Sequence, residues 1–170
     1  MFLLNDAVMQ VLQYTYTYDI KNAFFVDKDA YDNTKHGRRY KYNYHPNGQL
    51  KSKEEYYMDG PKVVKHGLHR EWYKDGILEE ESIFKDGKLQ GLCRNWYFNG
   101  KLYKEAYYND GKRYGLHRRW YLNDQLGEEY NRKDDKLHGI YRRWYENGEL
   151  AEEREYANGE LIRGKDCGTV

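Results

Sequence analysis

Aromatic and apolar positions recur along the chain with a fixed period from residue 36 onward. In each copy a glycine stands five residues before a tryptophan, a tyrosine follows the tryptophan at once, and a leucine stands five residues after that tyrosine. A looser copy begins at His36-Gly37 and a truncated one at Arg163-Gly164. The tryptophans lie 24 residues apart, at Trp72, Trp96, Trp120 and Trp144. Such a period is typical of stacked structural repeats, so it predicts five units and a stub.

Each unit contains two turn signals, which are Asp75-Gly76 and Asp86-Gly87 in the second unit. Dipeptides of this kind suit two-residue hairpin turns because both residues tolerate a positive φ. In the fourth unit Asp124 and Asp135 replace both turn glycines, and Asp enters this conformation at modest cost. A helix would carry a glycine-bearing turn in its interior, so the pattern predicts strand, turn, strand, turn.

A two-residue first turn also predicts the pairing of the flanking strands. Counted outward from the turn, the tyrosine of each unit faces the leucine, and in three units an aromatic ring faces the repeat glycine. Cross-strand pairs contribute roughly 0.2–1 kcal/mol each, and a slip of one residue would lose them all. The same register matches opposite charges in four units, pairing Arg70 with Glu81, Arg94 with Glu105, Arg118 with Glu129, and Arg142 with Glu153. We expect these pairs and the four tryptophans to form a structural ladder.

The recurring string His-Gly-x-x-Arg-x-Trp-Tyr-x-x-Gly-x-Leu-x-x-Glu is followed by an aromatic residue and by Asp-Gly or Asn-Gly. It resembles MORN repeats of the variant type and covers residues 36–165. The resemblance implies a mainly β fold, an elongated antiparallel sheet of stacked hairpins. It also implies a scaffold or interaction surface rather than an enzyme, although some family members are described as lipid-associated and some bacterial relatives as antitoxin-like. Residues 166–170 are then a tail.

Residues 1–31 do not share the period. Apolar residues from Leu3 to Leu12 fall on one face at helical spacing, and a second helix is predicted to start near Asp19. The alternation from Tyr14 to Tyr18 ends the first helix. We expect this short helical segment to cap the repeat sheet, because a terminal repeat otherwise exposes an apolar face and an unpaired edge.

The same segment is similar to an F-box. The resemblance rests on Leu4-x-Asp6-x-Val8-x-x-x-Leu12-x-Tyr14 and on Asp19-Ile20-x-Asn22-x-x-x-Val26-x-Lys28, with Asn5 where a proline is usual. An F-box-like end joined to MORN-like repeats also resembles proteins of large DNA viruses. The resemblance implies docking of a ubiquitin-ligase adaptor through five apolar side chains, Leu4, Val8, Leu12, Ile20 and Val26. A simple cap and an adaptor-docking segment therefore both stay open.

Composition sharpens this picture. Mean hydropathy is −1.18 and 34% of residues are charged, yet 17% are aromatic, with 20 tyrosines, whereas disordered chains are poor in aromatics. The formal net charge of +1 lacks the basic excess of nucleic-acid-binding domains, so no nucleic-acid partner is expected. No apolar run reaches the length of a membrane span, and the N-terminus does not resemble a signal peptide. The two cysteines form no framework, which favours a reducing, intracellular compartment.

Candidate chemistry recurs with the repeat instead of converging on one place. Histidines at equivalent positions of stacked hairpins would lie about 10 Å apart, too far for a shared zinc ion. Glutamates that repeat opposite arginines are more simply a structural ladder than an acid–base pair. The basic pairs Arg118-Arg119 and Arg142-Arg143 leave an anionic lipid surface as a weaker alternative. We expect no catalytic residues, metal or cofactor.

These observations favour a non-enzymatic repeat scaffold that binds a protein partner. A structural component of a virion or assembly is the main alternative, followed by a lipid-surface binder or an antitoxin-like protein. A thin sheet also favours self-association, so a homodimer stays open. Each face of the predicted sheet carries large rings and a polar ladder, and either face can therefore hold the core.

Overall fold

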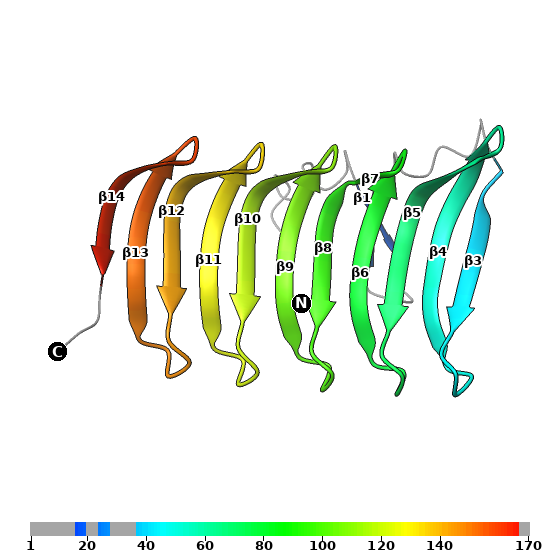
Figure 1. Ribbon diagram of the computed structural model, residues 1–170, viewed down its shortest axis with the longest axis horizontal. Coiled ribbons are helices and arrows are strands. Elements are labelled where there is room, and N and C mark those ends of the chain that lie inside the picture. The colour runs from blue at the N-terminus through cyan, green and yellow to red at the C-terminus, as the bar shows by residue number, and fades with distance from the viewer. Residues whose placement is uncertain (1–15, 20–23, 28–36, 167–170) are drawn as a thin grey trace, which may run out of the picture.

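The computed structural model describes residues 16–19, 24–27 and 37–166. Within residues 37–166 the chain forms one 12-stranded antiparallel sheet, whose strands lie side by side in a single row in chain order (Figure 1). Only the short β7 leaves this path, pairing with β6. The strands are β3 (Arg39–Tyr44), β4 (Leu50–Asp59), β5 (Lys62–Trp72), β6 (Leu78–Lys85), β7 (Lys88–Leu89), β8 (Gly91–Trp96), β9 (Leu102–Asn109), β10 (Lys112–Trp120), β11 (Leu126–Lys133), β12 (Lys136–Trp144), β13 (Leu150–Ala157) and β14 (Glu160–Asp166).

The second turn of the second to fifth units is the predicted two-residue hairpin turn, whereas the first unit turns at Gly60-Pro61. In the second unit Asp86 has a φ of 50° and Gly87 a φ of 82°, and Lys85 pairs with Lys88 to close the loop. Two positive φ values are the requirement of a type I′ turn, which matches the twist of the flanking strands. The fourth unit keeps the same turn with two aspartates, at φ values of 51° and 65°.

The first turn is one residue longer than predicted. The amide of Gly76 donates to the carbonyl of Tyr73 (2.9 Å), and the amide of Tyr73 donates to the carbonyl of Ile77 (2.8 Å). This is a type I turn followed by a residue at positive φ, here Gly76 at 87°. The Asp75 carboxylate accepts the Ile77 amide and supports the turn (3.3 Å). The prediction of a two-residue first turn was therefore wrong.

A β-bulge next to each first turn compensates for the extra loop residue. Trp72 pairs with Leu78 instead of the predicted pairing of Tyr73 with Leu78, and Glu79 is the additional residue between the two registers. Beyond the bulge Arg70 pairs with Glu81, as the two-residue turn predicts. The same shift occurs in all five hairpins of this kind within residues 37–166. The tyrosine–leucine pairs were wrong, and the register of the charges was right.

The repeat glycines face the predicted residues and have a second role. Gly67 pairs with Phe84, Gly91 with Tyr108 and Gly139 with Tyr156, while Gly115 faces Arg132. All four glycines have a positive φ, between 72° and 96°. They lie where the pairing with the neighbouring unit shifts register or is interrupted. Only glycine adopts this backbone without a steric cost, which explains why it recurs.

No described residue is helical, so the predicted helical N-terminal segment is not supported. Instead, β1 (Tyr16–Asp19) and β2 (Phe24–Asp27) form an antiparallel pair. The second helix, predicted to start near Asp19, was wrong because Tyr16–Asp19 and Phe24–Asp27 are rich in aromatic and β-branched residues, which favour strands. The first predicted helix, from Leu3 to Leu12, lies outside the described residues. None of the described segments is a helix long and apolar enough to cross a membrane.

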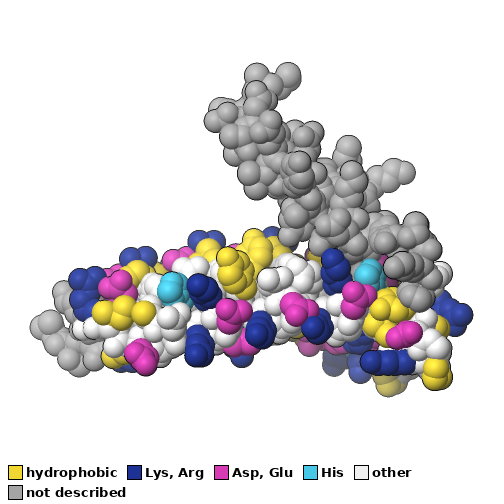
Figure 2. Space-filling model, turned by 90° about the horizontal axis from the view of Figure 1, so that it is seen from above, with side chains coloured by type: hydrophobic (Ala, Val, Ile, Leu, Met, Phe, Trp, Pro, Cys, Tyr) yellow, Lys and Arg dark blue, Asp and Glu magenta, His cyan; other side chains and the backbone are white. Residues whose placement is uncertain are grey.

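The sheet is one layer thick, and more of its buried side chains lie on one face than on the other. Seen from above it is a narrow band along which basic and acidic side chains alternate (Figure 2). The face that carries the repeat glycines and His117 is here called the histidine face. The other face, which carries the predicted pairs Arg70–Glu81, Arg94–Glu105, Arg118–Glu129 and Arg142–Glu153, is called the ladder face. Five buried residues form one row across the histidine face: His69, Ser82, Cys93, Ala106 and His117. On the ladder face Glu81 and Ile83 are also buried. The histidine face therefore carries the larger part of the core.

Candidate interaction surface

Charged side chains alternate along one row of the ladder face. The closest contacts join Arg70 to Glu81 (2.7 Å), Arg118 to Glu129 (2.8 Å) and Arg142 to Glu153 (2.7 Å), and looser ones join Glu105 to both Arg94 and Arg118 (3.7 Å each). The four pairs within hairpins have the sequence-predicted register, and the contact of Arg118 with Glu105 joins neighbouring hairpins. The side chains are partly exposed, so each pair is expected to add at most about 1 kcal/mol. The row sets the register of the sheet more than its stability.

Apolar side chains form a second row on the ladder face. Leu68, Leu92, Leu116 and Ile140 occupy equivalent positions and are half-buried. Opposite Leu92 lies Tyr107, which is 41% exposed. Arg and Tyr beside partly exposed aliphatic side chains are the residue types that anchor protein–protein interfaces. The ladder face therefore combines charge with accessible apolar area.

The tryptophans tie neighbouring units together through their main chain. The hydroxyl of Tyr73 donates to the carbonyl of Trp96 (2.8 Å), and the same bond joins Tyr97 to Trp120 (2.7 Å) and Tyr121 to Trp144 (2.9 Å). In the first unit His45 takes the place of the tyrosine and contacts the carbonyl of Trp72 (2.7 Å). Burial raises the pKa of Tyr73 and Tyr97, so both remain donors at neutral pH. The tyrosine after each tryptophan was the sequence signal for this contact, and sequence reasoning missed it.

His117 is the largest fully buried side chain among the described residues. It is 1% exposed, its ring stacks on Tyr130 with centroids 5.2 Å apart, and neither ring nitrogen has a hydrogen-bond partner in the described part of the chain. Burial, followed by the nearby charge of Arg132, lowers its pKa to about 4. His117 is therefore neutral at physiological pH and serves as a packing residue.

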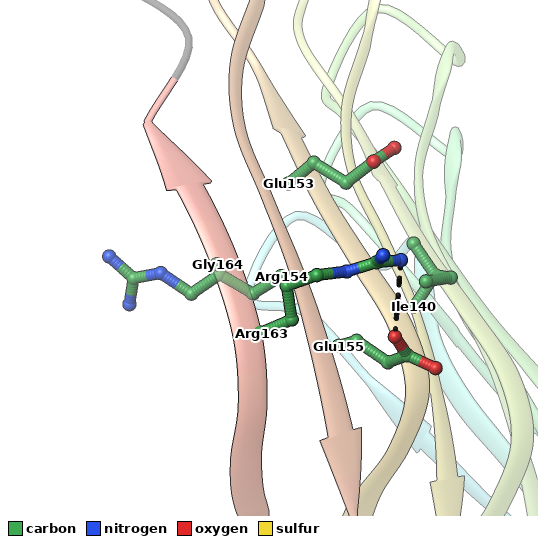
Figure 3. Close-up of a pocket in the computed structure, with 6 residues that line it drawn as sticks. All are labelled: Ile140, Glu153, Arg154, Glu155, Arg163 and Gly164. Atoms are coloured by element: carbon green, nitrogen blue, oxygen red, sulfur yellow. Dashed lines mark ion pairs between the residues drawn. The ribbon is translucent and has the colours of Figure 1, made fainter.

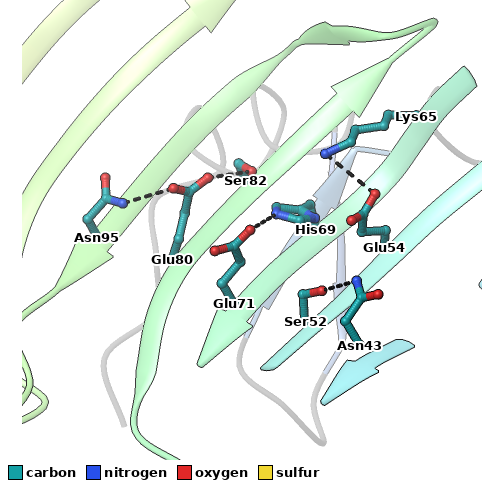
Figure 4. A network of polar contacts seen from close by, with 9 residues as sticks. All are labelled: Asn43, Ser52, Glu54, Lys65, His69, Glu71, Glu80, Ser82 and Asn95. Atoms are coloured by element: carbon teal, nitrogen blue, oxygen red, sulfur yellow. Dashed lines mark hydrogen bonds and ion pairs between the residues drawn. The ribbon is translucent and has the colours of Figure 1, made fainter. Parts of the chain in front are cut away.

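Other reactive groups on the histidine face are also structural. Burial raises the pKa of the Cys93 thiol to about 12, so it is not a ready nucleophile. Across residues 37–166 and the two short strands, no group of three His, Cys, Asp or Glu residues could hold a metal ion. Polar contacts cross this part of the sheet instead (Figure 4). Neighbouring strands are joined by Asn43–Ser52, Glu54–Lys65 and Glu80–Asn95, and residues of one strand by His69–Glu71 and Ser82–Glu80. These contacts hold the sheet together and bring no catalytic constellation into one place.

A hollow lies near the C-terminal end of the sheet, between β12, β13 and β14 (Figure 3). Its residues are Ile140, Glu153, Arg154, Glu155, Arg163 and Gly164. Arg163 pairs with Glu155 there (3.3 Å) while its side chain stays 77% exposed. A hollow open to solvent and lined by paired charges lacks the enclosure that a small-molecule site needs.

Of the side chains predicted to dock an adaptor, Val26 lies in β2. The remaining four, Leu4, Val8, Leu12 and Ile20, lie outside the described residues. The strand conformation at Val26 differs from the helix that the F-box resemblance implies.

Comparison with known proteins agrees with the repeat geometry. The model of a family described as MORN repeat variant matches residues 35–57, 65–86, 89–110 and 137–158, together slightly more than half of the chain. The unmatched unit between them forms the same hairpin from β10 and β11, although aspartates replace both its turn glycines. No curated protein matches the chain. MORN repeats are generally non-enzymatic and are consistent with a role in mediating interactions. On the matched units and the hairpins that they form, this chain belongs to the MORN repeat variant family.

Proposed function

We propose that this protein is a non-enzymatic scaffold that binds a protein partner through the ladder face of its hairpin array. One observation carries the proposal: the ladder face repeats the same arginine, glutamate and half-buried aliphatic positions unit by unit along a single-layer sheet. A repeating surface of this kind offers an extended contact area, as other repeat arrays do. The largest row of buried residues lies on the opposite face, whereas ladder-face residues such as Tyr107 are exposed and can meet a partner.

Affinity capture with two matched variants tests this proposal. Tyr107→Asp places a charge on the ladder face, whereas Tyr145→Asp places it at a tyrosine of similar exposure (43% against 41%) in the first turn of the fifth unit. A partner captured by the full chain and by Tyr145→Asp, but at least tenfold less by Tyr107→Asp, supports binding through the ladder face. Equal capture by both variants contradicts it. Circular dichroism checks that both variants keep the sheet.

The F-box-like spacing supports a second role for residues 1–31, the recruitment of a ubiquitin-ligase adaptor. With Val26 in a strand, docking would depend on the other four side chains, Leu4, Val8, Leu12 and Ile20. A pull-down from a eukaryotic lysate compares the wild-type chain with Leu12→Asp. Recovery of the adaptor by the wild type alone supports this role, and equal recovery by both chains contradicts it.

The remaining alternatives give different outcomes in simple assays. A virion or assembly component would be present at fixed stoichiometry in purified particles. A binder of anionic lipid would float with liposomes that contain phosphatidylserine. A homodimer would show twice the chain mass in solution. Each of these results would indicate that the main interaction is not with a separate protein partner.

A further inference from the structure

The strand at one end of the sheet carries an unusual set of tyrosines. Among the described residues β3 pairs only with β4, so β3 is the terminal strand (Figure 1). The inner units have three ladder-face positions in a row, occupied first by Leu or Ile, then by Arg and then by Trp. At these positions β3 has Tyr40, Tyr42 and Tyr44. Their side chains are 45%, 46% and 62% exposed. Here this group is called the tyrosine strip.

The alternation of charge also breaks at this end. Arg94, Arg118 and Arg142 each have a glutamate cross-strand neighbour on both sides, whereas Arg70 lies between Glu81 and Lys53. Within residues 37–166 Lys53 has no carboxylate partner. Its ammonium group leans toward the terminal strand instead and lies 4.9 Å from the centre of the Tyr40 ring. The Lys53 ammonium therefore lies beside the tyrosine strip, where Glu55 is the cross-strand neighbour of Tyr40.

The histidine face of β3 is basic as well. Arg39 and Lys41 are exposed there. The cross-strand neighbour of Lys41 is Glu54, but the Glu54 carboxylate already pairs with Lys65 (3.4 Å). Inside the array, by contrast, the basic strands β8, β10 and β12 each lie between two glutamate-bearing strands. The outer side of β3 is the one place in the described sheet where a basic strand has no such neighbour on one side.

We propose that the outer edge of β3 binds an extended acidic segment of a protein partner as an added antiparallel strand, with apolar side chains on the tyrosine strip and acidic side chains beside Arg39 and Lys41. Edge strands bind peptides through main-chain hydrogen bonds, and alternate side chains then select the sequence. Tyrosines add apolar contact area at low cost in side-chain entropy. The inference rests on the proposed function and adds to it the partner's chemistry and a second contact site.

A titration followed by ¹H–¹⁵N NMR of the full chain tests this site. The probe is a capped heptapeptide, Val-Glu-Val-Glu-Val-Glu-Val, and its control has lysine in place of each glutamate. We expect saturable shifts confined to Arg39–Tyr44 and its neighbour β4 with the acidic peptide alone. Lys41→Glu should weaken binding at least tenfold. Lys74→Glu, the same charge change at an exposed first-turn residue, should change it less than twofold.

Three results would overturn the inference. One is the absence of saturable shifts, and another is equal binding of the acidic and basic peptides. The third is tighter binding of a twelve-nucleotide oligothymidylate than of the acidic peptide, which would assign the tyrosine strip to stacking of nucleic-acid bases. A failure of this inference can be told apart from a failure of the proposed function. The proposed function is tested at Tyr107 on β9, which lies far along the row of strands from β3.

Discussion

Tyr97 donates its hydroxyl hydrogen bond to the main-chain carbonyl of Trp120, 23 residues further along the chain, over 2.7 Å. The bond joins two neighbouring repeat units and recurs twice more among the described residues, from Tyr73 and from Tyr121. It makes each tryptophan the acceptor for the preceding unit. The Trp-Tyr dipeptide that marks each repeat therefore also couples neighbouring units, because its tyrosine donates the bond and its tryptophan carbonyl accepts one.

Removing the hydroxyl of Tyr97 should weaken this coupling. Because the bond is partly buried, we expect Tyr97→Phe to lower the free energy of unfolding by about 0.5–1.5 kcal/mol, measured by urea denaturation. Tyr145→Phe is the matched control, since Tyr145 is exposed and no described residue accepts a bond from its hydroxyl. Equal losses in the two variants would contradict a role for the interunit bond.

Protonation of His117 should destabilise the folded chain. The folded-state pKa is lowered to about 4 from 6.5, so the unfolded chain binds the proton first as the pH falls. The stabilising contribution of the neutral ring is complete above pH 6.5 and is lost as the pH falls toward 4, by about 3 kcal/mol. Nearby Arg132, Lys104 and Arg113 act in the same direction, and Asp135 opposes them.

His117→Cys provides the control for this pH dependence, because Cys93 occupies the equivalent position in the preceding unit. Urea midpoints measured from pH 7 to pH 4 should fall more steeply for the wild type than for the variant. Parallel curves would show that His117 does not titrate in this range.

The first turn of the fourth unit stores backbone strain. Asp124 has a φ of 68°, where the equivalent residues in the other units are glycines. It also makes an exposed ion pair with Lys101 (2.6 Å). Asp124→Ala removes the ion pair and keeps the strain, whereas Asp124→Gly removes both. We expect the glycine variant to be more stable than the alanine variant by about 1 kcal/mol, measured as the difference in unfolding free energy. A less stable glycine variant would contradict this account.

Gly127 is required for space, not for its backbone angle. A Cβ atom there would lie 2.8 Å from the ring of Tyr121, whose hydroxyl is bonded to the Trp144 carbonyl. We expect Gly127→Ala to cost about 1–3 kcal/mol by displacing this ring. Ala151 occupies the equivalent position in the next unit, so Ala151→Gly is the reverse control. A neutral Gly127→Ala would show that the ring moves freely. Thermal denaturation measures both variants.

The sequence was sufficient to predict the hairpin array, because turn residues, periodicity and cross-strand charges all pointed to one register. It led to the correct pairing of Arg70 with Glu81 through a turn of the wrong length. The error cancelled because the longer loop and the bulge at Glu79 each shift the register by one residue, in opposite directions. A dipeptide such as Asp75-Gly76 fits both turn types, so sequence alone does not separate them.

The location of the core and the N-terminal conformation were harder to predict. Both faces carry rings and charges, and only packing shows that His117 is buried while Arg118 stays partly exposed. Near the N-terminus the helical spacing of apolar residues competed with the strand preference of Phe24-Phe25-Val26, and the strand formed. Short apolar runs leave this choice to tertiary context.

Position-resolved photo-cross-linking tests the central claim most directly. The residue p-benzoylphenylalanine replaces Tyr107, which is exposed on the ladder face, or its neighbour Tyr108, which faces the opposite side of the same strand. If the ladder face binds the partner, the cross-link forms from position 107 with at least tenfold higher yield than from position 108. Equal yields, or a cross-link only from position 108, would contradict the account.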